Sequence, residues 1–372
     1  MAQPDAGTSH PVPDLRSRLC YTLVAEVLRD LEIHLIEIRS VRFLADYPWQ
    51  TGKRLRPITF LLSNLSVQVQ RTTRPVLNGR ESGLAAAIEL LHEASLVHDD
   101  IVDRSTLRRG KPSMQVLHGE GLALLIGDYM VFRGLKLILD AAVSRNDIVL
   151  AQELANTGLA IAHGEADQLD KYLNRRDWEI RMSMDNYIGI IGKKTAAFFA
   201  GCAEAGAAMA GGDKELRELY RDFGMNMGLA FQMVDDLMDI LGDPVKASKT
   251  LQNNVAEGTV TLPMIHAWEL YPDDPLLGKL ARAEPLNRRE QARVQKILSR
   301  PEVVEWSGST MNGYAAKAQR SLERMPSSIY RMGLADLLDY VVHCSWGGLE
   351  SKLARAACRA QPGGTPPPKE PN

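Results

Sequence analysis

The sequence is poor in cysteine, and its few cysteines form no pattern. Only four of the 372 residues are cysteines, Cys20, Cys202, Cys344 and Cys358, and no two of them stand in a Cys-x-x-Cys spacing. Such scattered cysteines predict neither a zinc site nor a disulfide framework. They fit a reducing compartment, so we expect a cytoplasmic protein.

Long apolar runs and an excess of charge of one sign are also missing. No stretch approaches the ~18 uninterrupted apolar residues of a transmembrane helix, and the first residues lack the basic start and apolar run of a signal peptide. The 44 basic and 46 acidic side chains give a formal charge of −2, which argues against a nucleic-acid binder that relies on a basic surface. Apolar residues still make up 45% of the chain, enough for a large buried core.

Strand-like alternation is scarce, whereas helical periodicity runs through most of the chain, so we predict an all-α fold. Residues 1–13 and 360–372 are polar and rich in proline and glycine, typical of disordered tails, and they leave one domain at 14–359. Besides the two acidic helices described next, we predict helices at 17–40, 54–70, 120–143, 148–171, 184–210, 263–270, 288–300 and 310–357, the last broken near Pro326. Polar loops are predicted at 104–113 and 242–261.

Two apolar helices end in the same acidic pattern, Asp-Asp-x-x-Asp. The first, within 79–103, carries Asp99, Asp100 and Asp103, and the second, within 216–240, carries Asp235, Asp236 and Asp239. The outer two aspartates of each set are one turn apart on one helix face, where like charges repel. Magnesium is often held by a few carboxylates plus substrate phosphates. One such motif is commonly a solvated helix end, but two copies in apolar helices favour a metal site.

The second acidic helix also contains two glycines one turn apart, Gly224 and Gly228. A pair of small residues at this spacing lets two helix backbones approach closely. We therefore interpret the pair as a packing feature of the core.

Basic clusters accompany the acidic helices. They are Lys53, Arg54 and Arg56; Arg108, Arg109 and Lys111; Lys193 and Lys194; and Lys249. A single basic run is usually a solvated surface, but a diphosphate needs both metal and cationic side chains, and arginine matches phosphate with two hydrogen bonds. Several clusters beside two metal helices indicate more than one bound diphosphate. His92 and Gln232 lie on the stripes of Asp99 and Asp235, either as core residues or as pocket residues.

Taken together, the segments GKRLRP, ELLHEASLVHDDIVDRSTLRRGKP, IGDYM, GEADQ, GKKTAAFF and GLAFQMVDDLMDILGD, followed by TLP, resemble the trans-polyprenyl diphosphate synthase family, also called polyprenyl synthetases. The resemblance implies an isoprenoid synthase-type bundle of antiparallel helices around a central apolar cavity, usually in a homodimer. It implies a chain-elongating prenyltransferase. An allylic diphosphate ionises with the help of about three Mg²⁺ ions, isopentenyl diphosphate attacks, and proton loss gives a longer polyprenyl diphosphate.

The resemblance also implies residue roles. The main magnesium ligands would be Asp99, Asp103 and Asp235, with Asp100, Asp236 and Asp239 as further candidates. The allylic diphosphate and its cation would be held by Arg108, Lys194, Thr195, Gln232 and Lys249. The diphosphate of isopentenyl diphosphate would be held by Lys53, Arg56, His92 and Arg109.

Several positions depart from the family pattern. Thr51 and Ser248 replace glycines, Gln115 a histidine, Asn254 an aspartate, Thr259 a lysine and Cys344 an arginine. These changes raise two alternatives, prenyl transfer to another acceptor such as an indole, and terpene cyclisation. A neutral acceptor would not need the four residues that match the pocket for the diphosphate of isopentenyl diphosphate, and all four of these residues are present. A non-catalytic subunit of a heteromeric synthase would be expected to lose acidic ligands, and both motifs are intact.

The residues below the first acidic motif predict the product length. One helical turn of about 5.4 Å is roughly the span of an isoprene unit. Ala94 and Ser95, one turn below Asp99, are small, whereas Leu91 and Ile88 lie about two and three turns down. We therefore predict a product of geranylgeranyl size or longer, unless Ala94 only packs against a neighbouring helix that supplies the floor.

Overall fold

The structure is a computed structural model that describes residues 28–35, 44, 47, 52–142, 145–173, 182–241, 259–282 and 284–344. Within these ranges the chain is helical except for turns and one two-stranded hairpin, which confirms the predicted all-α class. None of the described helices combines the length and apolar character needed to cross a membrane.

The elements follow one another along the chain. The first part contains α3 (Leu55–Gln68), α4 (Gly79–Val102), β1 (Leu107–Arg108), β2 (Lys111–Pro112), α5 (Met114–His118), α6 (Glu120–Ala141) and α7 (Arg145–Leu173). The central part contains α9 (Met184–Ile191), the π-helix η4 (Gly192–Ala196), α10 (Ala197–Met209) and α11 (Lys214–Leu241). The last part contains α13 (Leu262–Leu270), α14 (Pro275–Ala281), α15 (Arg288–Leu298), α16 (Pro301–Arg324), α17 (Ile329–Asp339) and the π-helix η5 (Tyr340–Cys344).

Most predicted helices agree with these bounds to within a few residues, and the break near Pro326 is confirmed. The predicted start of the last helix at 310 is wrong, because α16 begins at Pro301, whose fixed φ suits the first helical turn. The predicted loop at 104–113 contains the β1–β2 hairpin. Its two turn residues, Arg109 and Gly110, have φ values of 51° and 78°, as a type I′ turn requires. Most of the loop predicted at 242–261 lies outside the described residues.

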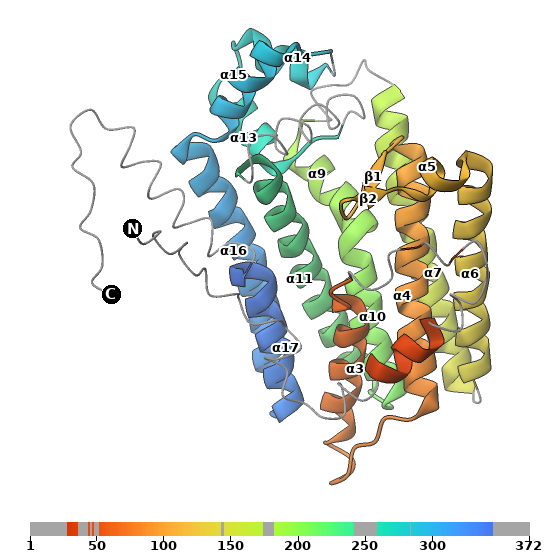
Figure 1. The fold of residues 1–372 in the computed structure, drawn as a ribbon. Helices are drawn as coiled ribbons and strands as arrows, with labels where there is room; N and C mark the ends of the chain where they lie inside the picture. Colours follow the sequence, from red (N-terminus) through yellow and green to blue (C-terminus); the bar gives the residue numbers. More distant parts are fainter. Residues whose placement is uncertain are drawn as a thin grey trace, which may run out of the picture.

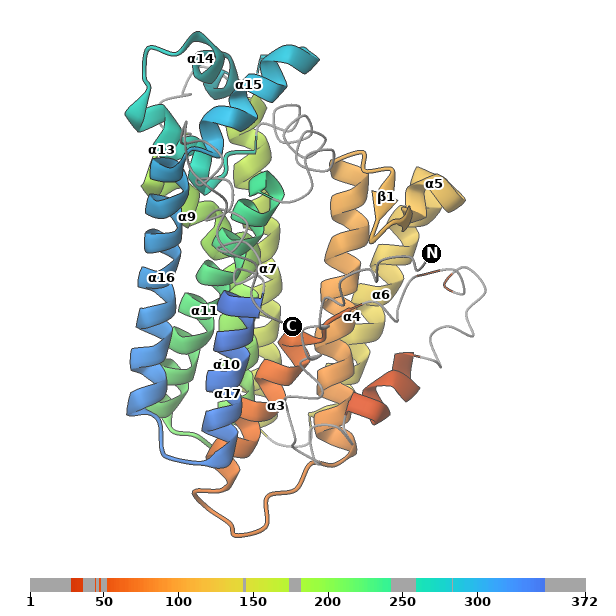
Figure 2. The same cartoon turned by 60° about the vertical axis from the view of Figure 1, so that its left-hand side comes forward.

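The long helices form a bundle in which α10 packs against α3, α7 and α11, while α4 packs along α6 and α11 along α16 (Figure 1). The hairpin that follows α4 and the helix α13 that follows α11 lie at the same end of the bundle in both views (Figure 2). The two acidic motifs, which close α4 and α11, therefore lie at one end of the molecule.

Glycines allow the central helices to approach one another closely. A Cβ added at Gly224 would lie 2.4 Å from the carbonyl oxygen of Phe199, and one at Gly228 would lie 2.6 Å from the Cα of Ala196. The interpretation of this pair as core packing is confirmed. Gly206 does the same on the other side of α10, where a Cβ would lie 2.2 Å from the carbonyl oxygen of Phe60 in α3. These contacts fix α10 and η4 against α11, and so fix the basic segment next to the second acidic motif.

Candidate active site

The first acidic motif has two open carboxylates and one that is held. Asp99 and Asp103 are partly exposed, and the Asp103 N–H donates to the carbonyl of Asp99 (2.8 Å) at the end of α4. Asp100 is buried and accepts hydrogen bonds from Arg108 Nε (3.0 and 3.1 Å) and Nη2 (2.5 Å). Asp100 therefore binds the hairpin, while its two neighbours remain available to a ligand.

The second motif has the same division. Asp235 and Asp239 are exposed, whereas Asp236 is buried. Asp236 accepts hydrogen bonds from the Tyr187 hydroxyl (2.7 Å), Gln232 Nε2 (3.1 Å) and the Leu262 backbone N–H (3.1 Å). The middle aspartate thus organises the protein, and the outer two face solvent.

The outer carboxylates of the second motif, Asp235 and Asp239, repel one another. Desolvation by the surrounding protein, followed by the neighbouring carboxylates of Asp239 and Asp236, raises the pKa of Asp235 to about 7. One side of this residue is still open to solvent. Desolvation, and then Asp236, raise the pKa of Asp239 to about 6. A divalent cation would relieve this repulsion, and an all-oxygen donor set suits magnesium.

In the described part of the chain, no three acidic, histidine or cysteine side chains come close enough together to hold a metal ion by themselves. A metal at either motif would therefore need further oxygen ligands from a substrate or from water. Magnesium binds in this way where one or two carboxylates and substrate phosphates share it.

The basic segment at η4 packs against α7 and α11. Lys194 Nζ forms an ion pair with Glu165 of α7 (2.7 Å), and although burial alone would lower the pKa of Lys194, Asp99 and Glu165 raise it. The Thr195 hydroxyl donates to Gln232 Oε1 (2.9 Å), whose amide in turn donates to Asp236. The structure therefore brings Lys194 to the first motif, and Thr195 and Gln232 to the second.

Arg56 is a guanidinium that contacts a histidine and two aromatic rings. Its Nη1 donates to His92 Nε2 (3.1 Å), and its plane lies over the rings of Phe198 and Phe199, 5.2 and 4.7 Å from their centroids. Its Nε is buried without a hydrogen-bond partner. Burial lowers the pKa of Arg56, and three nearby carboxylates offset part of this fall, although none of them forms an ion pair with Arg56 within the described residues. These carboxylates belong to Glu89, Asp235 and Glu93. Burial, followed by the charge of Arg56, lowers the pKa of His92 well below its usual value, so His92 is neutral and can accept.

Comparison with known proteins decides the family. The model of the family described as polyprenyl synthetase matches residues 40–299. The chain belongs to the polyprenyl synthetase family. A short chain isoprenyl diphosphate synthase of Methanothermobacter thermautotrophicus is 31% identical over 78% of the chain and 86% of its own length. A heptaprenyl diphosphate synthase component 2 of Geobacillus stearothermophilus is 32% identical, over 78% of the chain and 85% of its own length.

A solved polyprenyl synthase of Caulobacter crescentus, complexed with calcium and isoprenyl diphosphate, superposes with a TM-score of 0.73. It is 29% identical, and the alignment covers 88% of this chain and 97% of the other. As a polyprenyl synthetase, the chain is a prenyltransferase of the chain-elongating class. The matches give no support to another acceptor, cyclisation or a non-catalytic chain.

Sequence reasoning missed several acidic and polar partners in this synthetase. Glu165 and Gln168, both in the GEADQ segment, contact Lys194 and Thr259, with Gln168 Nε2 donating to the Thr259 hydroxyl (3.0 Å). Glu89 and Glu93 are buried in α4 beside the basic loops. The two glutamates are four residues apart, so they lie on one face of α4, and this face is not the one that carries Asp99. That spacing was the signal that could have found them.

The departures from the family pattern have mixed outcomes. Gln115 Nε2 donates to the carbonyls of Asp100 (2.5 Å) and Ser105 (2.7 Å), so it caps the end of α4. Thr51, Ser248, Lys249 and Asn254 lie outside the described residues. Cys344 ends η5.

The candidate chain-length residues do not share one environment. Ala94 and Ile88 are fully buried, and Ser95 is partly exposed with its hydroxyl donating to the His92 carbonyl (2.8 Å). Leu91 is directed at α6, since a Cβ at Gly134 would lie 3.2 Å from its Cγ. Leu91 therefore packs against α6.

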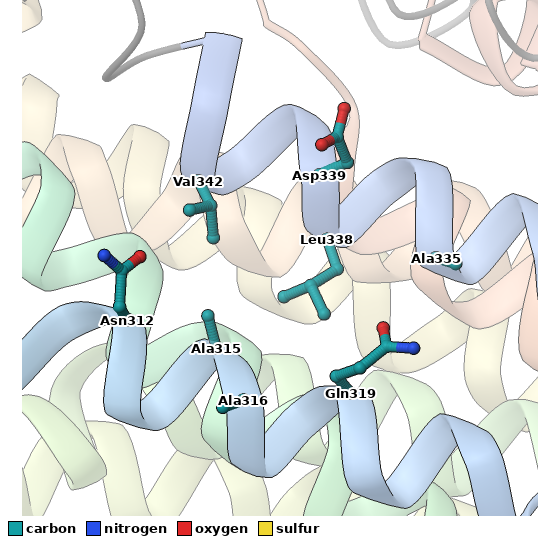
Figure 3. Close-up of a pocket in the computed structure, with 8 residues that line it drawn as sticks. All are labelled: Asn312, Ala315, Ala316, Gln319, Ala335, Leu338, Asp339 and Val342. Atoms are coloured by element: carbon teal, nitrogen blue, oxygen red, sulfur yellow. The ribbon is translucent and has the colours of Figure 1, made fainter. Parts of the chain in front are cut away.

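A cavity of about 240 Å³ lies between α16 on one side and α17 and η5 on the other (Figure 3). It is lined by Asn312, Ala315, Ala316, Gln319, Ala335, Leu338, Asp339 and Val342. None of these is a predicted site residue.

Proposed function

We propose that the chain condenses isopentenyl diphosphate with an allylic prenyl diphosphate and forms a product of geranylgeranyl size or longer. The observation that carries this proposal is the pairing of carboxylates that repel one another with a guanidinium that is incompletely satisfied. Desolvation and neighbouring carboxylates raise the pKa of Asp235 and Asp239 at the second motif. Lys53 and Arg56 offset only part of the rise in pKa at Asp235. Arg56 in turn has a buried Nε without a hydrogen-bond partner. Metal-bound diphosphates would satisfy both.

The proposed magnesium ligands are Asp99, Asp103, Asp235 and Asp239, with about three ions per site, while Asp100 and Asp236 position the surrounding groups. When bound, the metal would supply charge stabilisation for the departing diphosphate. Lys194 would add a cation beside the first motif, and Thr195 and Gln232 would line the approach to the second.

Lys53, Arg56, His92 and Arg109 would bind the diphosphate of isopentenyl diphosphate. Arg56 would then point its unsatisfied hydrogen-bond donors at phosphate oxygens, and neutral His92 would keep its own orientation by accepting from Arg56. Lys53 Nζ lies 5.7 Å from the ring centroid of Tyr340, which fixes the direction of its flexible stem. Lys249 is proposed as a ligand of the allylic diphosphate.

The test is product analysis with purified protein. We expect labelled isopentenyl diphosphate to be added to dimethylallyl, geranyl, farnesyl or geranylgeranyl diphosphate in the presence of Mg²⁺, with mass spectrometry giving the chain length. EDTA should abolish the product, and excess Mg²⁺ should restore it. Diphosphate release without an extended product from any primer would contradict the proposal and favour another acceptor or a cyclisation.

A second proposal concerns assembly: we infer a homodimer built on α5, α6 and α7. Leu125, Phe132 and Leu139 of α6 are seven residues apart and 61%, 69% and 66% exposed, so they form one apolar stripe on a helix that would otherwise face water. Leu117 of α5 and Leu159 of α7 are also exposed. Phe132→Asp should give a monomer by light scattering, whereas Leu270→Asp, a change at another exposed leucine on α13, should not.

Two further proposals concern organisation. We propose that residues 14–359 form one catalytic domain between two polar tails. A cytoplasmic location is proposed because the one cysteine with a described side chain, Cys202, is buried and free.

A further inference from the structure

A fully buried carboxylate lies beneath the cations of the second diphosphate pocket. The side chain of Glu93 in α4 has no exposed surface. It accepts hydrogen bonds from Arg109 Nη2 (3.0 Å), from Arg109 Nη1 (3.3 Å) and from the Tyr47 hydroxyl. Arg54 Nη1 lies 3.7 Å from Oε1, the oxygen that also accepts from Arg109 Nη2. Such a charge is buried at a high cost unless it is paired, and here two guanidinium groups share it.

The two arginines that meet at Glu93 also share an uncommon backbone. Arg54, the N-cap of α3, has a φ of 56°, and Arg109, in the hairpin turn, has a φ of 51°. L residues other than glycine rarely adopt this left-handed region. Such a conformation persists only where its surroundings hold it in place. Glu93 contacts both arginine side chains and so helps to hold both backbones.

These arginines belong to the two segments that supply the pocket. Lys53 and Arg56 flank Arg54, and the other segment contributes Arg109 itself. Arg54 is further fixed by ion pairs with Glu89 and with Glu32 (3.1 Å). A Cβ at Gly52 would lie 2.7 Å from Arg54 Nη1, so this glycine gives the guanidinium room to reach α4.

We propose that Glu93 is a positioning residue that fastens both segments to one point of α4, so that Lys53, Arg56 and Arg109 converge on one diphosphate. The inference rests on the proposed function, because it assumes that this diphosphate belongs to isopentenyl diphosphate. Glu93 does not touch the substrate. It acts through Arg109 and Arg54, and its removal would loosen one binding pocket and leave the acidic motifs in place.

The test is the steady-state kinetics of Glu93→Gln, which keeps size and shape but removes the charge. We expect the KM for isopentenyl diphosphate to rise about tenfold, with the KM for the allylic substrate and kcat changed less than about twofold. Glu81→Gln is the matched control. Glu81 is also buried in α4, in the capping box with Asn78 at the far end of the helix, and its loss should lower stability without moving either KM.

Tyr47→Phe gives a second variant that removes one donor to Glu93 without changing any charge, and it should raise the same KM by about threefold. A double-mutant cycle between Glu93→Gln and Arg109→Gln should be strongly non-additive in that KM. Additive effects, an equal rise in both KM values, or a loss of stability alone would overturn the proposal. If the unchanged protein does not elongate any primer, the proposed function fails first, which separates the two results.

Discussion

The two acidic helices end in the same motif but hold its middle aspartate in different ways. Asp100 is held by the charged side chain of Arg108, on an exposed hairpin, whereas Asp236 is held by three neutral donors within the core. Cations therefore surround the first motif, while the second depends on neutral hydrogen bonds and keeps uncompensated charge. The difference teaches that the same sequence pattern can be stabilised by ion pairing or by burial, and that its dependence on metal differs accordingly.

The largest effect should come from the outer aspartates, where the two motifs act alike. Asp99→Ala and Asp235→Ala should each lower kcat by about 10³ or more, because each removes a ligand that supports charge on the leaving group. Asp222→Ala, at an exposed position on α11 between three and four turns before Asp235, is the control and should leave kcat unchanged. A small loss in one of the two outer variants would mean that its motif does not share the metal chemistry.

Replacing the middle aspartate should change the free energy of unfolding by different amounts in the two acidic helices. Asp236→Asn places an amide NH₂ against at least one of three donors, so it should lower the free energy of unfolding by about 1–3 kcal/mol. Asp100→Asn should cost less, since Arg108 is partly exposed and water can replace the lost charge. Chemical denaturation of both variants measures the difference. Equal losses would remove the distinction between the motifs.

We expect the residue one turn before the acidic motif to control product length in α4 but not in α11. Ser95 precedes Asp99 and is small, whereas Phe231 precedes Asp235 and packs on Phe199 with 5.4 Å between ring centroids. Ser95→Phe should therefore shorten the product by at least one isoprene unit, as read by mass spectrometry. Ser95→Ala should leave the product unchanged. An unaltered product length in Ser95→Phe would mean that a residue on another helix closes the bottom of the cavity.

The smallest effect should come from Thr259, which lies opposite Gln168 of α7. Thr259→Lys adds a cation on the side of the site where Lys194 is already paired with Glu165. The KM for the allylic substrate should fall by about threefold, the size of one exposed electrostatic contact. Thr259→Gln, similar in reach but neutral, should not lower it, and a rise in both variants would show that the hydroxyl itself is needed.

Helical periodicity allowed much of this structure to be predicted, because it is a local property of the chain. The bounds of α4, the end of α11 and the packing of Gly224 and Gly228 all follow from residues within a few turns of one another. The partners of the carboxylates could not be predicted in the same way. Tyr47 and Glu93 are 46 residues apart, and which donor reaches a carboxylate depends on tertiary packing and rotamers.

The hairpin illustrates the same limit. Its Arg-Gly turn is a weak signal between two-residue strands, and its ion pairs with Asp100 and Glu93 appear only once α4 is in place. The departures at Gln115 and Thr259 were seen in the sequence, but their hydrogen bonds to a helix end and to α7 were not.

The π-helical segment η4 has a consequence for how this chain can vary in length. A π turn holds one more residue than an α turn, and each helical residue adds about 100° of rotation. Deleting one residue between Gly192 and Ala196 would restore α-helical pairing and rotate Lys194 away from Glu165 relative to α10. Substitution at exposed Lys193 keeps that rotation, whereas a one-residue insertion or deletion changes it. At the exposed position of Lys193, the number of residues in this segment is therefore constrained more strictly than the identity of the residue.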